Sequence, residues 1–240
     1  SDEDLAVLRS SPLVAAAGAY TPLILEKRRL YFARQWQDEV ELAAGILQLA
    51  AAAPDDVPDG MRLAEVLQQL FGAESGLDWQ RMAAKLALQR RFLTISGGPG
   101  TGKTTTVVRL LAALAMTSSR PLVMAMAAPT GKAAARLTES VRAAQARMTL
   151  SATLQATLPQ SAQTLHRLIG LIPGVAQPRH HAANPLPLDV LVIDEASMID
   201  LGLMAQTIRA LPAHARLILL GDKDQLSSVD AGAVLADICS

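Results

Sequence analysis

The sequence predicts an α/β fold in which a parallel sheet is flanked by helices and preceded by a small α+β accessory region. From Leu77 onward, short runs that are apolar on both faces alternate with helical stretches, as in a buried parallel sheet. The charge balance changes at about the same place, since residues 1–75 carry a net charge of −6 and residues 76–240 carry +6. We therefore expect two parts, residues 1–75 and residues 76–240.

The accessory region is predicted to contain a hairpin and helices. "TPLILEKRRLYFARQ", residues 21–35, alternates around a charged tip and predicts the hairpin, and a helix is expected from about Trp36 to Leu49. "PDDVPDG", residues 54–60, breaks that helix and marks a linker. The amphipathic pattern of residues 61–71 predicts a short helix after it.

Four buried strands are expected in the second part, with helices following the first three. They are "RFLTIS" (91–96), "LVMAMAAP" (122–129), "LDVLVID" (188–194) and "ARLILLGD" (215–222). Residues 151–187 contain five prolines, and we expect mostly loop there, around one short helix at "SAQTLHRLIG", residues 161–170.

Composition excludes several classes of protein. Half of the residues are hydrophobic and 18% are charged, which is typical of a globular chain. No apolar run approaches the roughly 18 residues of a membrane helix, and the first residues lack the basic and apolar regions of a signal peptide. A single cysteine, Cys239, rules out an internal disulfide and a cysteine metal cluster. We expect a soluble, cytoplasmic protein without a membrane partner.

A glycine-rich segment predicts a phosphate site. "GGPGTGKT", residues 97–104, fits G-x-x-x-x-G-K-[ST] between a predicted strand and a predicted helix. In this pattern backbone N–H groups surround the phosphates, Lys103 brings positive charge to them, and the Thr104 hydroxyl binds Mg²⁺. The expected nucleotide contacts are Gly98, Pro99, Gly100, Thr101, Gly102, Lys103, Thr104 and Thr105. The structural alternative is a glycine-rich turn with a surface lysine.

Two further strand ends carry candidate catalytic groups. Asp194 and Glu195 end a buried strand, which we expect to neighbour the strand before the phosphate loop. Asp194 would then lie beside Mg²⁺, and Glu195 would activate water. Gln225 follows the last strand, where an amide can hydrogen-bond the γ phosphate or the attacking water. An acidic turn after a core strand is the alternative for that segment.

The order and wording of five motifs resemble superfamily 1 helicases, in particular the RecD subunit family of exodeoxyribonuclease V. These motifs are "GGPGTGKTTT", "AAPTGKAAARL", "TLHRLIG", "VIDEASMID" and "GDKDQLSSVDAGAVLADI". "PLILEKRRLYFARQWQDE" is similar to the RecD accessory region. The resemblance implies a RecA-like P-loop NTPase domain with ATP and Mg²⁺ as cofactors. It assigns catalysis to Lys103, Glu195 and Gln225, and Mg²⁺ binding to Thr104 and Asp194.

The resemblance also implies roles outside the phosphate site. Thr130 with Lys132, and Thr164 with His166, resemble segments that contact single-stranded DNA, although a helix N-cap and a buried histidine are the alternatives. Gln80 resembles the family's adenine-reading glutamine, because an amide matches the donor at N6 and the acceptor at N7. An exposed glutamine near a helix start is its alternative.

A short basic run extends beyond these segments. Lys132, Arg136, Arg142 and Arg147 lie together with a single acid, Glu139. Such a run is either a solvated helix face or a polyanion contact, and the sequence leaves both open.

The resemblance implies an ATP-dependent DNA helicase that moves 5′ to 3′ and acts in double-strand break repair by recombination. Its partners would be single-stranded DNA and RecB and RecC type subunits. Residues 76–240 are then expected to be the first of two motor domains, and the chain to hydrolyse ATP poorly without the arginines of the second. The alternatives are a free-standing RecD-like helicase, a conjugative relaxase motor, a P-loop kinase, a non-enzymatic assembly subunit and a self-contained P-loop NTPase.

Overall fold

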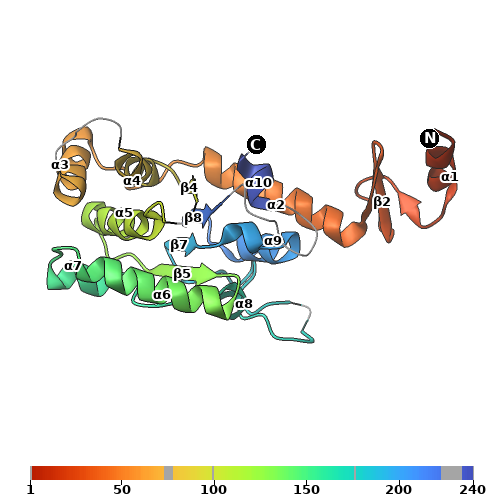
Figure 1. The fold of residues 1–240 in the computed structure, drawn as a ribbon. Helices are drawn as coiled ribbons and strands as arrows, with labels where there is room; N and C mark the ends of the chain where they lie inside the picture. The colour runs from red at the N-terminus through yellow and green to blue at the C-terminus, as the bar shows by residue number, and fades with distance from the viewer. Residues whose placement is uncertain (1, 73–77, 99, 176, 223–233, 240) are drawn as a thin grey trace.

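The computed structural model describes residues 2–72, 78–98, 100–175, 177–222 and 234–239 (Figure 1). The helices are α1 (Asp2–Ser10), α2 (Ala33–Ala51), α3 (Gly60–Phe71), α4 (Trp79–Gln89), α5 (Lys103–Thr117), α6 (Gly131–Ala146), α7 (Ala152–Thr157), α8 (Leu165–Ile169), η1 (Ala196–Met198, a 3₁₀ turn), α9 (Leu201–Ala210) and α10 (Val234–Cys239). The strands are β1 (Val14–Ala15), β2 (Leu23–Glu26), β3 (Arg29–Phe32), β4 (Phe92–Ser96), β5 (Met124–Ala128), β6 (Ala162–Thr164), β7 (Val190–Ile193) and β8 (Arg216–Gly221).

The larger sheet has five parallel strands in the order β4-β8-β7-β5-β6. The four predicted strands and the parallel α/β fold are thereby confirmed. Every residue of β7 and β8 is buried, which explains why these strands read as continuous apolar runs. Within the described residues, no helix is both long and apolar enough to cross a membrane.

The structure corrects the expectation for residues 151–187. The expected single helix at residues 161–170 is a short strand, β6, followed by α8, and residues 152–157 form the unpredicted helix α7. β6 is a three-residue edge strand paired only with β5 among the described strands, from Met126↔Ala162 to Ala128↔Thr164. Its three residues are half-buried, and each of them is small or polar, so it lacks the apolar run that marks a central strand.

The position of the acid-bearing strand is a second correction. We expected β7 to neighbour β4, but β8 lies between them and pairs with both, through Ser96↔Gly221 and Ile193↔Leu219. The last strand in the chain can insert there because parallel strands are joined by crossover helices rather than by tight turns. Gly221 of β8 is thereby placed directly beside the start of the phosphate loop.

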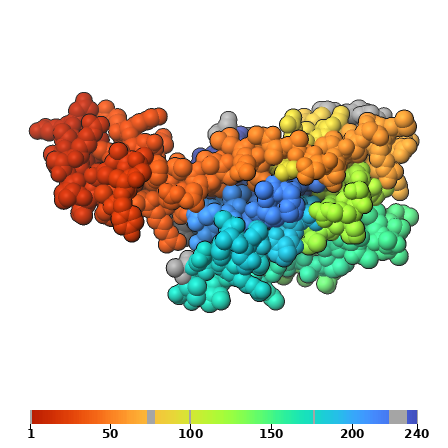
Figure 2. Space-filling view, turned by 180° about the vertical axis from the view of Figure 1, so that it is seen from behind, coloured from red at the N-terminus to blue at the C-terminus, as the bar shows by residue number. Residues whose placement is uncertain are grey.

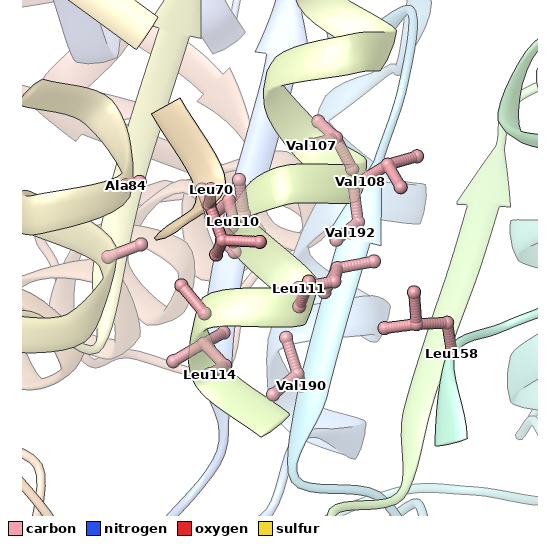
Figure 3. Close-up of a cluster of buried hydrophobic side chains, with 14 of the residues drawn as sticks. Leu70, Ala84, Val107, Val108, Leu110, Leu111, Leu114, Leu158, Val190 and Val192 are labelled. Carbon is pink, nitrogen blue, oxygen red and sulfur yellow. The ribbon is translucent and has the colours of Figure 1, made fainter. Parts of the chain in front are cut away.

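The core lies on both faces of this sheet. On one face, apolar side chains of α5 pack on Val190 and Val192 of β7, with Leu158 beside them (Figure 3). Leu70 of α3 and Ala84 of α4 pack on the same helix from its other side. Because burial of apolar area is the main stabilising contribution to folding, α5 is fixed firmly beneath the phosphate loop.

On the other face, α9 packs on the sheet and α2 packs on α9. Gly45 of α2 permits this approach, because a Cβ there would lie 2.3 Å from Cγ2 of Ile208. Leu42 and Leu49 of α2 belong to the same buried hydrophobic cluster as the side chains on this face of the sheet. The long helix α2 is therefore part of the core as well as a connection to the N-terminal residues.

The N-terminal elements form a second, smaller sheet. They lie at one end of the molecule (Figures 1 and 2). The predicted hairpin is confirmed as the antiparallel pair β2–β3, and β1 adds a parallel strand. The helix expected over residues 36–49 is α2, which is longer, and the helix expected over residues 61–71 is α3. The division at residue 75 stays a prediction, and α2 and α3 pack against later helices.

Candidate functional site

One edge of the large sheet brings the predicted site segments together. All five strands are parallel, so their carboxyl ends meet at the same edge. The phosphate loop follows β4, the acid pair follows β7, and the two segments expected to contact DNA follow β5 and overlap the end of β6. In open α/β sheets this edge is where ligands bind.

The phosphate loop has a backbone that only glycine adopts easily. Gly100 and Gly102 have φ of +78° and +80°, in the left-handed region. The N–H of Gly97 donates to the carbonyl of Gly221 at 3.1 Å, which ties the start of the loop to β8. The Thr101 hydroxyl donates to the carbonyl of Gly98 at 2.9 Å. Pro99 lies outside the described residues.

Lys103 is the first residue of α5 and its ammonium bends back over the loop. Nζ donates to the carbonyls of Gly97 and Gly98, the latter at 2.9 Å. An ammonium has three donors and no acceptor, so carbonyl oxygens are suitable partners for it. Thr104 and Thr105 follow in the first turn, half-buried, where the positive end of the helix dipole favours an anion.

Asp194 is half-buried at the end of β7. Its Oδ1 accepts a hydrogen bond from the N–H of Glu195 at 2.9 Å. Burial raises the pKa of the Asp194 carboxyl, and the Glu195 N–H and the positive charge of Lys103 lower it in part. Lys103 and Asp194 therefore influence each other electrostatically even though β8 separates their strands. A carboxylate with too little compensating charge is suited to a cation.

Glu195 follows with φ of +52°, a conformation that is rare outside glycine and recurs at functional positions. Gln225, the third candidate catalytic residue, lies outside the described residues. Within the described ranges, no group of three or more His, Cys, Asp or Glu side chains could hold a metal ion. A cation here would need phosphate or water oxygens besides Asp194 and Thr104, which is the usual situation for Mg²⁺.

Gln80 lies against the phosphate loop. Asp78 caps α4 by accepting from the N–H groups of Gln80 and Arg81 at 2.9 and 3.2 Å. A Cβ at position 102 would lie 2.7 Å from Nε2 of Gln80, so Gly102 is needed for this contact as well as for its φ. The side chain is half-buried, and the alternative of an exposed glutamine is wrong.

Arg109 of α5 is a residue that the sequence analysis did not single out. Its Nη1 donates to Oε1 of Gln80 at 3.4 Å, and its guanidinium lies 5.1 Å from the ring centre of Phe71. A signal was present in the sequence, because Arg109 is the only charged residue within the apolar run of residues 106–115. A charge in such a run needs a partner, since burying it unpaired is costly.

Both threonines of the expected DNA segments cap helices. Thr130 accepts from the N–H of Ala133 at 3.2 Å and begins α6, and Thr164 accepts from the N–H of Arg167 at 3.3 Å and begins α8. The N-cap interpretation is thus confirmed for both. A cap uses only the oxygen as acceptor, so each hydroxyl proton remains available to a further acceptor.

The charged members of these segments face solvent. Lys132 and His166 are exposed, and the alternative of a buried histidine is wrong. Within the basic run, Arg142 donates from Nε to the carbonyl of Gln160 at 3.0 Å, which anchors the loop after α7. That arginine therefore has a structural role, whereas the structure leaves the polyanion contact of the run as a prediction.

Comparison with known proteins gives the family context of this geometry. A family model described as an AAA domain matches residues 80–231. The chain is 48% identical to the RecBCD enzyme subunit RecD of Mycobacterium tuberculosis (strain CDC 1551), over 98% of the chain and 39% of that protein. It is 36% identical to the ATP-dependent RecD2 DNA helicase of Deinococcus radiodurans, over 94% of the chain and 27% of that protein.

A solved structure of two coordinating Pif1 helicases at forked double-stranded DNA aligns with a TM-score of 0.40 and 20% identity, covering 68% of this chain and 38% of that one. The chain thus spans less than half the length of these relatives. The resemblance to RecD drawn from the motifs is confirmed at the level of sequence similarity. The match over residues 80–231 shows that the chain belongs to the AAA domain family.

Proposed function

We propose that this chain is the ATP-binding motor part of a RecD-type DNA helicase. The AAA domain family implies nucleotide binding. The observation that carries the proposal is the meeting of the glycine loop, the Lys103 ammonium and the desolvated Asp194 carboxyl at one sheet edge. Similarity to RecD over 98% of the chain supports DNA as the substrate on which the motor acts.

The phosphates of ATP would be held by the loop N–H groups and the amino terminus of α5. Lys103 would exchange the carbonyls of Gly97 and Gly98 for phosphate oxygens, because a charged acceptor makes a stronger hydrogen bond than a neutral one. Thr104 and Asp194 would hold Mg²⁺, directly or through water. When bound, Mg²⁺ supplies positive charge to the phosphates.

Glu195 would take the proton of the attacking water, since it follows Asp194 directly and has the left-handed backbone conformation that recurs at functional positions. Gln225 would contact the γ phosphate, and Gln80 would contact the base. The remaining loop residues, Gly98, Pro99, Gly100, Thr101, Gly102 and Thr105, would contribute backbone or first-turn contacts to the nucleotide.

Single-stranded DNA would lie across the ends of β5 and β6. Lys132 and His166 are exposed there and can approach phosphates. Thr130 and Thr164 can donate their hydroxyl protons to phosphate while their oxygens cap α6 and α8. These contacts are independent of base sequence, which suits a motor that moves along DNA.

At the level of the whole protein, we propose a 5′ to 3′ translocating subunit of a RecBCD-type exodeoxyribonuclease V that acts in double-strand break repair, in the cytoplasm, with RecB and RecC type partners. Residues 76–240 would form its first motor domain. The 36% identity to RecD2 keeps a free-standing RecD-like helicase as the second candidate. Co-purification with RecB and RecC type subunits separates the two.

The test is ATP hydrolysis by the 240-residue chain, with and without single-stranded DNA, beside a chain extended to the length of RecD. We expect DNA-stimulated hydrolysis by the extended chain and weak hydrolysis by the short one, because arginines from a second motor domain can contribute about 10³ to 10⁵ in rate. Rapid, DNA-independent turnover by the short chain would instead indicate a self-contained NTPase and contradict the proposal.

A further inference from the structure

Three elements meet around one arginine beside the candidate nucleotide site. Arg109 projects from α5, and its guanidinium lies 5.1 Å from the ring centre of Phe71 at the end of α3. Its Nη1 donates to Oε1 of Gln80 on α4 at 3.4 Å. Gln80 in turn contacts the phosphate loop at Gly102. The contacts therefore run from α3 through the arginine and the glutamine to the loop.

The hydrogen-bonding capacity of the guanidinium fixes the direction of the Gln80 amide. Arginine has five donors and no acceptor, so the atom of Gln80 that faces it must be the carbonyl oxygen. The amide nitrogen then points the other way, and Nε2 is indeed the atom that lies 2.7 Å from a Cβ built at Gly102. Rotation of the amide by 180° would set its NH₂ group against the arginine and lose the contact.

Phe71 restrains the arginine in turn. A guanidinium near an aromatic face is attracted to it by a cation–π interaction. Nε of Arg109 is buried and has no hydrogen-bond partner in the described part of the chain, so the Phe71 and Gln80 contacts compensate for its burial. The arginine is thus held from α3 and has its Nη1 presented to α4.

We propose that Arg109 is a positioning residue that orients the Gln80 amide, with the oxygen toward Arg109 and the NH₂ group toward the nucleotide. This inference rests on the proposed ATP site. Gln80 then acts as a hydrogen-bond donor, and a purine offers it an acceptor at N7. Without Arg109 the amide would occupy both orientations, and recognition of N7 would weaken.

Removal of Arg109 is structurally feasible. The side chain lines a hollow of about 390 Å³ together with Arg147, Met148 and Leu154. An unbranched methionine can occupy this space without overpacking, because it adapts its three rotatable bonds. Arg109→Met therefore removes the donor while leaving most of the apolar contact with Phe71.

The matched control is Arg81→Met. Arg81 lies next to Gln80 in α4, and its Nη1 donates to the carbonyl of Gly72 at 2.9 Å. Like Arg109, it joins the end of α3 to α4, but its hydrogen bond does not involve Gln80. A general loosening of α3 would appear in both variants, whereas loss of amide orientation would appear only in Arg109→Met.

The first readout needs no nucleotide. In ¹⁵N-labelled protein, the side-chain NH₂ signals of Gln80 are identified by their loss in Gln80→Ala. We expect them to shift in Arg109→Met and to stay in place in Arg81→Met. Unchanged Gln80 signals in Arg109→Met would overturn the contact itself.

The second readout is the dissociation constant for ATP and for 7-deaza-ATP, which lacks the N7 acceptor, measured by calorimetry with Mg²⁺. We expect the wild-type chain to bind ATP about three- to tenfold more tightly, the usual effect of one hydrogen bond. The ratio of the dissociation constant for 7-deaza-ATP to that for ATP should approach one in Arg109→Met and in Gln80→Ala. It should keep the wild-type value in Arg81→Met. In Arg109→Lys, which retains a donor, it should recover in part.

The outcomes separate the two hypotheses. If the wild-type chain binds neither nucleotide, the proposed function fails and this inference fails with it. If binding is intact but the ratio is the same in wild type and Arg109→Met, only this inference is contradicted. A further drop in the ratio when Arg109→Met is added to Gln80→Ala would also contradict it, because a residue that acts through Gln80 has no effect in its absence.

Discussion

The two ends of β7 place two aspartates in opposite environments. Asp189, before the strand, accepts from the guanidinium of Arg120 and from the N–H of Val123 at 2.8 Å. The hydrogen bond from Arg120 holds the pKa of Asp189 below its usual range, against the effect of burial. Asp194, after the strand, has its pKa raised by burial. The charged form of aspartate is therefore stabilised at one edge of the sheet. At the other edge, the effect of burial on the charged form is only partly offset by neighbouring groups.

The amino edge is closed by further charge pairs. Arg216 pairs with Asp56 at 2.6 Å and Arg91 with Asp55 at 3.0 Å, so the linker of residues 54–60 is attached to the base of the sheet. The carboxyl edge has glycines in left-handed conformations, and the Lys103 ammonium is bound only to carbonyl oxygens among the described residues. We propose that charge serves stability at the amino edge and nucleotide binding at the carboxyl edge.

The largest effect is expected from a substitution at the carboxyl edge of the sheet. Lys103→Ala should lower ATP hydrolysis by the extended chain about 10² to 10³-fold, because it removes one preorganised positive donor from the phosphates. The melting temperature of the nucleotide-free chain should change little, since the hydrogen bonds of Lys103 within the described ranges go to loop carbonyls. Turnover assays and thermal unfolding check this, and unchanged turnover would contradict the site assignment.

The next largest effect is expected from a substitution at the amino edge of the sheet. Asp189→Asn should lower the free energy of unfolding by about 1 to 3 kcal/mol, because hydrogen bonds from Arg120 and Val123 lose their charged acceptor. ATP affinity should be unchanged, because Asp189 lies at the opposite edge of the sheet. Denaturant unfolding and nucleotide titration measure the two quantities; a loss of affinity at constant stability would refute the division between edges.

A smaller effect of opposite sign is expected at the other end of the same strand. Asp194→Asn should leave stability unchanged or raise it by about 1 kcal/mol, because it removes a charge that burial disfavours. Mg²⁺-dependent ATP binding should weaken in the same variant. Denaturant unfolding and titration with and without Mg²⁺ test the pair of outcomes. Marked destabilisation would show that Asp194 is a structural residue.

The smallest effect is a difference in pH dependence. For Asp189 the folded pKa lies below the unfolded value, near 3.8, so its contribution to stability is complete above that value and is lost as the pH falls through the folded pKa. For Asp194 the folded pKa lies above 3.8. Its charged form therefore lowers the stability of the folded chain fully above the folded pKa, and this loss of stability disappears as the pH falls below 3.8.

The stability differences between wild type and each asparagine variant should therefore shrink on acidification, with that of Asp194→Asn fading at the higher pH. Unfolding curves over an acid series provide the measurement. If both stability differences were lost at the same pH, the environments of Asp189 and Asp194 would be electrostatically equivalent.

Much of this arrangement was predictable from local pattern. The loop of residues 97–104 follows from its glycines and Lys103, and the four long strands follow from apolar runs. The short strand β6 was not predictable in this way, because half-buried residues at a sheet edge leave no apolar run. The partners of Arg109 were not predictable either, since Phe71 and Gln80 lie on other helices and contact it only in the folded chain.

The sequence by itself determined which chemical groups this protein carries and where the four long strands and the glycine loop lie, because periodicity and backbone preference act over a few neighbouring residues. Only the tertiary structure decided that β8 separates β4 from β7, and that Asp189 is paired while Asp194 is desolvated. Those properties depend on the distances and burial that packing creates between residues far apart in the chain, and neither is encoded at the position itself.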